Sequence, residues 1–493
     1  MTKKQITIFI IVFLILFMSW WGWNKYAAPT RVALINFPNF QTATIATSSP
    51  HNFIKINNVS LDELHRLKRY DAVLIFGMGI RIDEGQRQQI QDAADRGIPV
   101  FTFNATNPAN NIQNKDSHTL KAIQLYMRYG ATVNYSNMLA FIREEIDGKK
   151  FFTPTWSEPV TIPDNYLYHT REELYFETLE EYKSYRVEQG LDKPGAKKIA
   201  LTGGISGGRN REHIVSMIEA FEAKGYNMYP IAGHSGRMEL LRSIEPDAVI
   251  YMPHGRLVGG DKAVNWLKNM NIPIFAPLTL LETAEKWEEN PMGMSGGFMS
   301  QSIVMPELDG AILSYAVHAQ YINEDGLHLF KAVPERLETF SQIVSNYLEL
   351  KDLDNAEKRV AIYYFKGSGL GPLTAAGLEV VPSLYEVLKS MKASGYNVEG
   401  LPATLDKFAE LIMSQGVVLG PYAKGAYEEY LKTGNPERVK TEDYLQWVEK
   451  TLPEKLYQDV VNNYGPAPGI YMAIREGEQE YIAVARIEFG NVV

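Results

Sequence analysis

The sequence contains no cysteine, and this absence removes several classes of site at once. Disulfides, thiolate zinc sites, iron–sulfur clusters and a cysteine nucleophile are all excluded. Positive charge is also in short supply, since 49 basic residues stand against 58 acidic ones and the formal net charge is −9. A protein that binds nucleic acid presents a basic surface, so we expect no nucleic-acid partner.

Signatures of metal and nucleotide sites are missing as well. None of the nine histidines is spaced as H-x-x-x-H or H-E-x-x-H, the arrangements that hold zinc on one face of a helix. Glycine-rich loops occur at 202–210 and 365–377, but neither matches the P-loop or the dinucleotide-binding fingerprint. We therefore find no ATP site in this chain.

The sequence does have a long apolar run near its N-terminus, from Ile6 to Trp23, without a charged residue. Its 18 residues are near the lower limit for a helix that spans a bilayer. Aromatic rings gather at one end of the run, at Trp20, Trp21 and Trp23, and such rings favour the membrane–water interface. We expect residues 1–30 to form a single-pass membrane anchor.

A cleaved signal peptide is the alternative for this segment. Cleavage needs small residues before the cut, whereas Lys25 and Tyr26 precede the stretch "AAPT". Lys3 and Lys4 predict an N-terminus in the cytoplasm, because positively charged flanks stay on that side of the membrane. The expected location is the inner (cytoplasmic) membrane, with the rest of the chain in the periplasm.

Three blocks of a repeating pattern follow the anchor. Buried strand patterns, such as 31–37, 71–80 and 98–104, alternate with amphipathic helical patterns. This alternation predicts an α/β fold of consecutive parallel sheets, flavodoxin- or Rossmann-like, with helices on both faces. The predicted domains are 31–190, 197–350 and 357–493, and the pattern of the third is incomplete at its C-terminal end.

Finer expectations concern the ends of these blocks. The segment 166–185 predicts an amphipathic helix, and 358–365 predicts the strand that opens the third block. Near the C-terminus, apolar and polar residues alternate through 481–488, as in a strand with one buried face. Gly490 and Asn491 then predict a turn.

Candidate site residues follow strands of the second block. His234 and His254 each come after a strand and lie among glycines. Ligands of α/β sheets bind beyond the carboxyl ends of the strands, and neutral imidazole is a common metal ligand. The alternative for each is a solvated loop histidine. His169 has weaker chemical support.

Two further groups of residues are candidates. Glu307 and Asp309 are predicted to point to one side of an extended stretch, where they would bind a cation or exchange protons with a ligand. A turn with a capping aspartate is the alternative. A glycine-rich loop before a helix suits a carboxylate, which gives three more candidates: Gly367, Gly369 and Gly371. A flexible connection is the alternative for this loop.

Several stretches together resemble the large subunit of class I chelatases, the family of cobaltochelatase CobN and the magnesium chelatase H subunit. "TAAGLEVVPSLYEVLKSMKASGYNVEGLP" (374–402) and "SIVMPELDGAI" (302–312) are the specific matches. "YLYHTREELYFETLEEYKSY" (166–185) is similar to a Tyr-His segment of CobN, with Thr170 where CobN usually has proline. "YGPAPG" (464–469) resembles an aromatic-Gly-x-Pro-Pro-Gly turn, with Ala467 replacing the first proline.

The resemblance implies a protein that binds a tetrapyrrole, either haem or a corrin precursor. It implies insertion of a divalent metal (cobalt, magnesium), as by a ligase that forms metal–nitrogen bonds, or removal of iron from haem. The anchor resembles the membrane-bound, HmuS-like branch of CobN-like proteins, which is linked to haem uptake. These interpretations leave metal, macrocycle and direction of reaction open.

The resemblance also bears on the C-terminus. In this family "FGNVV" leads into a longer part, which carries a His-Gly-Thr-His-Gly stretch that is thought to handle the metal, and no such stretch occurs here. We expect the N-terminal portion of a larger polypeptide. The alternative is a non-catalytic tetrapyrrole-binding module whose partner, a separate chelatase subunit, carries the missing part. A periplasmic binder of small ligands would be a third class.

Overall fold

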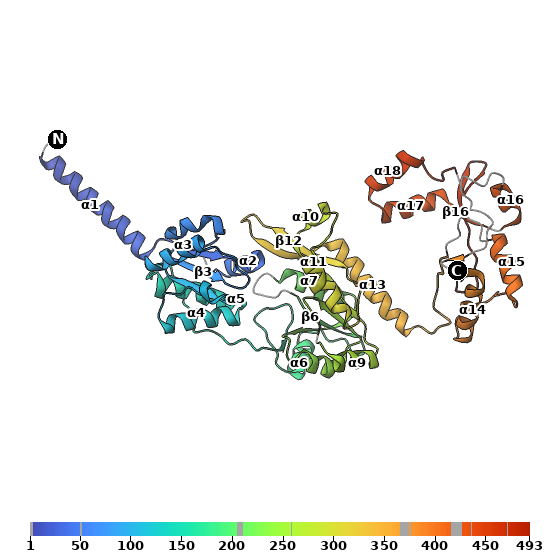
Figure 1. The fold of residues 1–493 in the computed structure, drawn as a ribbon, viewed down its shortest axis with the longest axis horizontal. Coiled ribbons are helices and arrows are strands. Elements are labelled where there is room, and N and C mark those ends of the chain that lie inside the picture. The colour runs from blue at the N-terminus through green and yellow to red at the C-terminus, as the bar shows by residue number, and fades with distance from the viewer. Residues whose placement is uncertain are drawn as a thin grey trace. The chain divides into compact units, whose positions relative to one another are not determined.

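The structure is a computed structural model that describes residues 3–49, 52–204, 211–257, 259–364, 374–375, 377–415, 426–434, 436–470 and 472–493. Its chain forms two compact units, Met1–Leu348 and Glu349–Val493. Figure 1 shows their elements coloured along the chain.

A single long helix opens the first unit. Helix α1 (Lys3–Tyr26) is drawn in dark blue in Figure 1 and carries no acidic residue in its first turn. Its window Phe9–Tyr26 has a mean hydropathy of 1.3, and none of that window is buried. By length and composition, this helix passes the test for a membrane span, a test that a signal sequence also passes.

The first sheet is parallel and follows α1 directly. Its strands lie in the order β2-β1-β3-β4, with all pairs parallel. Strands and helices are β1 (Thr30–Ile35), α2 (Asn39–Thr47), β2 (Ile54–Asn58), η1 (Leu61–Arg69), β3 (Ala72–Phe76), α3 (Glu84–Asp95), β4 (Val100–Phe103), η2 (Pro108–Asn110), α4 (Ser117–Tyr129), α5 (Ala131–Phe141) and the π-turn η3 (Ile142–Ile146).

Alternate residues of these strands enter two separate cores. Val32 and Leu34 pack with α4 and α5 on one face, while Ala33 and Ile35 pack with η1 and α3 on the other. Both faces are therefore dry, as the uninterrupted apolar strands predict.

The second sheet has six strands in the order β11-β9-β8-β6-β7-β5. Its pairs are parallel except that β5 runs antiparallel to β7. The elements are β5 (Tyr166–Leu167), α6 (Leu179–Glu188), β6 (Lys198–Gly203), α7 (Glu212–Ala223), β7 (Asn227–Ala232), α8 (Arg237–Ile244), β8 (Ala248–Met252), α9 (Asp261–Asn269), β9 (Ile274–Phe275) and β11 (Ala311–Ile312).

A smaller sheet and a long helix complete the first unit. The sheet has the order β10-β12-β13, and α13 packs on the second sheet through Phe340 and Val344. The elements are β10 (Leu278–Thr283), α10 (Ala284–Glu289), α11 (Gly296–Met299), the π-turn η4 (Ser300–Val304), α12 (Met305–Glu307), β12 (Ala316–Ile322), β13 (His328–Ala332) and α13 (Pro334–Asp352), whose end lies in the second unit.

The second unit holds a hairpin and an antiparallel sheet, β16-β18-β17. Its described elements are β14 (Thr374–Ala375), β15 (Leu378–Glu379), α14 (Val380–Ala393), α15 (Leu405–Gln415), α16 (Ala426–Thr433), β16 (Glu437–Lys440), α17 (Thr441–Thr451), α18 (Glu454–Tyr464), β17 (Ala473–Glu476) and β18 (Gln479–Val484).

The predicted α/β fold class is confirmed, and two finer expectations are wrong. The segment 166–185 is not one helix, because Tyr166–Leu167 pairs with β7 and helix α6 starts only at Leu179, behind a Thr178 capping box. The segment 358–364 is not a regular strand either. Its Val360 makes a parallel bridge to Val492, so its partner is the chain segment after the predicted turn at 490–491.

The domain limits stay a prediction, but two elements of the first predicted domain belong to the second sheet and its core. Strand β5 and helix α6 fall in the segment predicted as the first domain (31–190), yet they pair and pack with the second sheet. A two-residue edge strand is too short to carry a period-2 signal, so the sequence pattern could not show that this segment pairs with the second sheet.

Two histidines lie in the core of the first unit. His318 of β12 is fully buried, and its ring centroid is 5.3 Å from that of His213 of α7. Its Nδ1 lies 3.2 Å from Thr279 Oγ1. Burial lowers the pKa of His318 to about 3, because the charged ring would lose its hydration.

We expect this histidine to make the protein sensitive to mild acid. Between pH 6.5 and about 3 the unfolded chain binds a proton at position 318 that the folded chain does not. The free energy of unfolding therefore decreases as the pH is lowered through this range. The slope from one such group is at most about 1.4 kcal/mol per pH unit. Denaturant titrations in detergent at pH 7 and pH 5 should show a smaller difference for His318→Leu than for wild type. An undiminished difference would contradict the prediction, and His118→Leu, at an exposed position, is the control.

Candidate functional site

A cleft in the first unit gathers aromatic and charged side chains from several elements. It consists of two cavities of about 270 and 450 Å³ that share Met127 and Arg128 as lining residues. We call it the tyrosine–arginine cleft. The first cavity is lined by Tyr135, Tyr166, Tyr168, Glu172, Tyr175 and Arg211, among others. The second is lined by Gln41, Phe76, Thr102 and Asn104, among others.

The position of the cleft follows from the polarity of the sheets. Phe76 ends β3 and Asn104 follows β4, so the second cavity lies at the carboxyl edge of the first sheet. Tyr166 pairs with Ala232, the last residue of β7, so the first cavity reaches the carboxyl edge of the second sheet. Carboxyl edges are where α/β sheets bind ligands, because the loops there are free of the ladder.

Arg211 is a buried cation that forms no ion pair within the described part of the chain. It lies immediately before α7, is only 8% exposed, and lines the cleft. One Nη donates to the carbonyl oxygen of His169 at 3.1 Å, and the guanidinium lies 4.7 Å from the ring centroid of Tyr168. Its Nε has no hydrogen-bond partner, and no carboxylate of the described residues forms an ion pair with it. Since burying an unpaired charge is costly, this side chain is suited to a carboxylate of a ligand.

Glu172 also lines the cleft but is already engaged. Its two carboxylate oxygens accept hydrogen bonds from the backbone N–H and the hydroxyl of Thr132, at 2.7 Å each. The carboxylate ties the start of α5 to the segment after β5. It therefore stabilises the wall of the cleft, and its two oxygens are occupied by Thr132 rather than by Arg211.

The tyrosines provide flat, neutral walls. Burial raises the pKa of Tyr168 to about 12 against the opposing effect of Arg211, and it raises the pKa of Tyr166 and of Tyr175 as well. Tyr166 and Tyr175 meet edge to face, with ring centroids 4.8 Å apart. Uncharged phenol rings at neutral pH offer apolar faces and hydroxyl groups that donate or accept hydrogen bonds.

A partly buried carboxylate holds the tyrosine segment in place. Glu222 of α7 lies 3.2 Å from Nε2 of His169 and accepts a hydrogen bond of 2.6 Å from the fully buried Arg186. Burial alone would raise the pKa of Glu222, but the hydrogen bonds from His169 and Arg186 outweigh it and lower the pKa. His169, which the sequence supported only weakly, thus acts on the backbone position of Tyr168 rather than on a ligand.

His234 and His254 lie where predicted, beyond β7 and β8, and both are exposed. Strand β6 separates these two strands, so the histidines belong to different loops. At Gly233, which follows β7 with φ +93°, a Cβ would lie 2.1 Å from the carbonyl oxygen of Asp164. The His234 loop is therefore packed tightly against the segment before Tyr166. Their roles as tetrapyrrole ligands stay predictions.

The expected pairing of Glu307 and Asp309 is wrong, because residues 305–310 are helical and turned rather than extended. Asp309 is fully buried and accepts hydrogen bonds from Arg256, at 2.8 and 2.6 Å, and from the backbone N–H of Leu257 at 2.7 Å. Glu307 is exposed. Asp309 thus fixes the loop that carries His254, while Glu307 does not share its site.

Two further kinds of site concern the glycine-rich loop and metal binding. Gly367, Gly369 and Gly371 lie outside the described residues, so their proposed binding of a peripheral carboxylate stays a prediction. Among the described residues, no group of three or more histidine, aspartate or glutamate side chains is arranged to hold a metal ion.

The different environments of Glu307 and Asp309 give a paired test. Asp309→Asn should leave the partly exposed Arg256 without its carboxylate and destabilise the protein by about 2 kcal/mol, since it breaks a partly buried ion pair. Glu307→Gln should change the melting temperature by less than about 1 °C, a surface effect. Thermal denaturation in detergent measures both, and equal effects of the two substitutions would show that the carboxylates act together.

Sequence reasoning missed the tyrosines and Arg211. A signal was present, because "YLYHTREELYF" carries three tyrosines and a phenylalanine within a short stretch. The prediction of a helix for this segment prevented us from grouping these rings in one site, because a helix would distribute them around its axis.

The fold is a multi-sheet α/β architecture, and the cleft at the carboxyl edges of its sheets is its candidate ligand site. The model of the CobN/Magnesium Chelatase family matches residues 124–493, and the chain belongs to this family.

Individual relatives are distant. The magnesium-chelatase H subunit of Chlorobaculum parvum is 27% identical over 325 residues, which is 60% of this chain and 24% of the relative. The aerobic cobaltochelatase protein CobN of Pseudomonas aeruginosa is 23% identical over 434 residues, covering 83% of this chain and 33% of the relative. The chain thus spans a quarter to a third of the length of these relatives.

A solved structure shares the fold. The catalytic subunit of cobaltochelatase from Mycobacterium tuberculosis aligns with a TM-score of 0.64 at 21% identity, covering 94% of this chain and 38% of that one. At this identity the likeness establishes the fold, and it confirms the α/β fold class that the alternation of strand and helix patterns predicts.

Proposed function

We propose that this chain binds a tetrapyrrole in the tyrosine–arginine cleft, as the N-terminal part of a CobN-type chelatase large subunit. The observation that carries the proposal is the buried Arg211, which has no acidic partner among the described residues and lies beside aromatic rings. A tetrapyrrole offers what this arrangement lacks, namely peripheral carboxylates for the guanidinium and a flat macrocycle for the rings.

The size and chemistry of the cleft support this ligand class. Cavities of about 270 and 450 Å³ in contact fall within the range of sites for cofactor-sized molecules. Tyrosine is also one of the side chains that bind haem iron. Tyr166 and Tyr175 are the phenols we expect nearest to a bound macrocycle.

The metal is substrate or product, and the names of the relatives cover two metals, magnesium and cobalt. Removal of iron from haem is the third reaction that we keep within the proposal. The alternative is a non-catalytic tetrapyrrole-binding module with a partner chain. It is favoured by the lack of a metal-holding cluster among the described residues.

We further propose that α1 anchors the chain in the inner membrane, with the body in the periplasm. Trp20, Trp21 and Trp23 support this, since each is about half exposed or more, and the ammonium of Lys25 lies over the ring of Trp21 at 4.8 Å. A body outside the cytoplasm has no ATP supply, which favours iron removal from haem over an ATP-driven insertion.

The central prediction concerns Arg211. Arg211→Gln removes the charge and should weaken binding of both haem and metal-free protoporphyrin at least tenfold, about 1.4 kcal/mol. Absorbance titration at the Soret band measures this for the detergent-solubilised chain. Arg171→Gln is the matched control, because Arg171 is exposed and paired with Glu173. Equal dissociation constants for wild type and Arg211→Gln would refute the proposed site.

The anchor has its own test. Ile11→Lys combined with Leu14→Lys places two charges in the middle of α1, each of which costs about 3 kcal/mol in a bilayer. The variant should be released from membranes by alkaline carbonate, whereas wild type should remain. Ile343→Lys, on the exposed side of α13, should behave like wild type. Release of wild type itself would contradict the anchor.

A further inference from the structure

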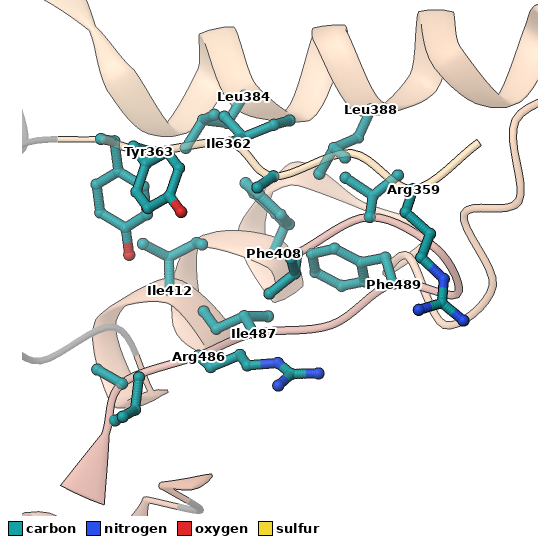
Figure 2. A pocket seen from close by; sticks show the side chains of 16 residues that line it. Arg359, Ile362, Tyr363, Leu384, Leu388, Phe408, Ile412, Arg486, Ile487 and Phe489 are labelled. Carbon is teal, nitrogen blue, oxygen red and sulfur yellow. The ribbon is translucent and has the colours of Figure 1, made fainter. Parts of the chain in front are cut away.

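The second unit contains a cavity that opens into its own core. It has a volume of about 510 Å³ and lies between α14, α15, the segment 359–364 and the C-terminal residues (Figure 2). Leu388, Phe408 and Phe489 line it, and the same residues form the buried apolar cluster of this unit. Figure 2 shows Phe408 and Phe489 in the centre, below Leu384 and Leu388 of α14. A folded domain normally fills such a space, because interiors pack densely.

Within the described part of the chain, one edge of the segment 359–364 is hydrogen-bonded and the other edge is not. On the used edge Val360 N–H donates to Asn491, Ile362 N–H donates to Val493, and Val493 N–H donates to Val360, all through carbonyl oxygens at 2.7–3.0 Å. The backbone N–H and C=O groups of Ala361 and Tyr363 have no partner within the described chain. An extended segment with one free edge and adjacent apolar volume is the arrangement that accepts an added strand.

The side chains of this segment fit that arrangement. Val360, Ile362 and Tyr364 pack against the core, and Tyr363 between them is 94% exposed. A strand laid along the free edge would therefore bury apolar side chains on the core face and leave its other face polar. The exposed ring of Tyr363 is placed to cover part of such a strand.

Two arginines give the cavity a charged rim. Figure 2 shows the side chains of Arg359 and Arg486 extending toward the same side of the cavity. Arg486 is paired with Glu437 and Glu488. Arg359 is exposed and forms no ion pair among the described residues. This free charge favours an acidic residue in the occupant.

We propose that the cavity and the free edge of 359–364 receive a β-strand from the remainder of the chelatase large subunit, the part of the relatives that this chain does not match. Two observations favour a strand over a small ligand. The unpaired groups are backbone donors and acceptors in a row, and the relatives have two thirds or more of their length outside the matched region. The strand has apolar residues at alternate positions and an acidic residue near Arg359.

The test uses overlapping fluorescent peptides that tile the unmatched part of Pseudomonas aeruginosa CobN, titrated with the full chain in detergent. At least one peptide with alternating apolar residues should bind, and hydrogen exchange should slow at the amides of Ala361 and Tyr363. Arg359→Glu lies on the surface and should weaken that peptide at least fivefold. Ala361→Pro removes an unpaired N–H from the free edge and should weaken it at least tenfold.

A control variant and the outcomes that would overturn the proposal complete the test. Leu456→Asp, at an exposed position on α18, should bind the peptide as wild type does. The proposal is overturned if no peptide binds, or if binding is unchanged in Arg359→Glu and Ala361→Pro. It is also overturned if haem binds and that binding is lost in Arg359→Glu but retained in Arg211→Gln, since the cavity would then hold the macrocycle itself.

Discussion

The geometry of the tyrosine–arginine cleft depends on one partly buried carboxylate, that of Glu222. It joins His169, which lies beside the tyrosine segment, to Arg186, which lies on the helix that follows. Arg186 in turn donates to the carbonyl oxygens of Met228 and Leu191, so the same group of contacts secures the start of β7 and the segment that follows α6. Without this carboxylate, the fully buried Arg186 would lose its counter-charge, and the segment after β5 would lose one of the contacts that hold it. The hydrogen bond from Arg211 to the carbonyl of His169 extends the chain of contacts into the cleft.

Some parts of the structure could be predicted from the sequence and others could not. Buried strands such as 31–37 and 71–80 were predictable, because a parallel sheet covered on both faces needs continuous apolar runs. The cleft was not, since it requires knowing which edges of two sheets meet, and that depends on β5 crossing to the second sheet. The Glu307–Asp309 expectation failed for a simpler reason. Spacing by two places side chains together only in a strand, and Pro306 lies instead at the start of a helical turn.

Another buried cation links helix α1 to the first sheet. Arg143, fully buried in the π-turn η3, donates to the carbonyl oxygens of Ala27, Ala28, Phe53 and Phe151 at 2.8–3.1 Å. Helix α1 therefore meets the sheet at the amino end of β1 through a packed joint. Because all strands of the first sheet are parallel, its carboxyl edge, with the cleft, lies at the opposite end from α1. An anchor at α1 would leave the cleft facing away from the lipid surface, where a ligand can enter.

The charge in the cleft also limits what can be bound there. A free metal ion would meet the guanidinium of Arg211 and phenols that burial keeps neutral, and Glu172 is engaged by Thr132. The guanidinium repels a bare cation, and the neutral phenols and the engaged carboxylate do not attract one. The same groups are suited to a planar anion. The metal would then arrive or leave as part of the macrocycle, or through groups outside the described residues. Under the proposed function, binding the macrocycle and handling the metal are separate tasks. This separation is physically reasonable, because ligands that hold a free cation tightly would compete with the macrocycle for it.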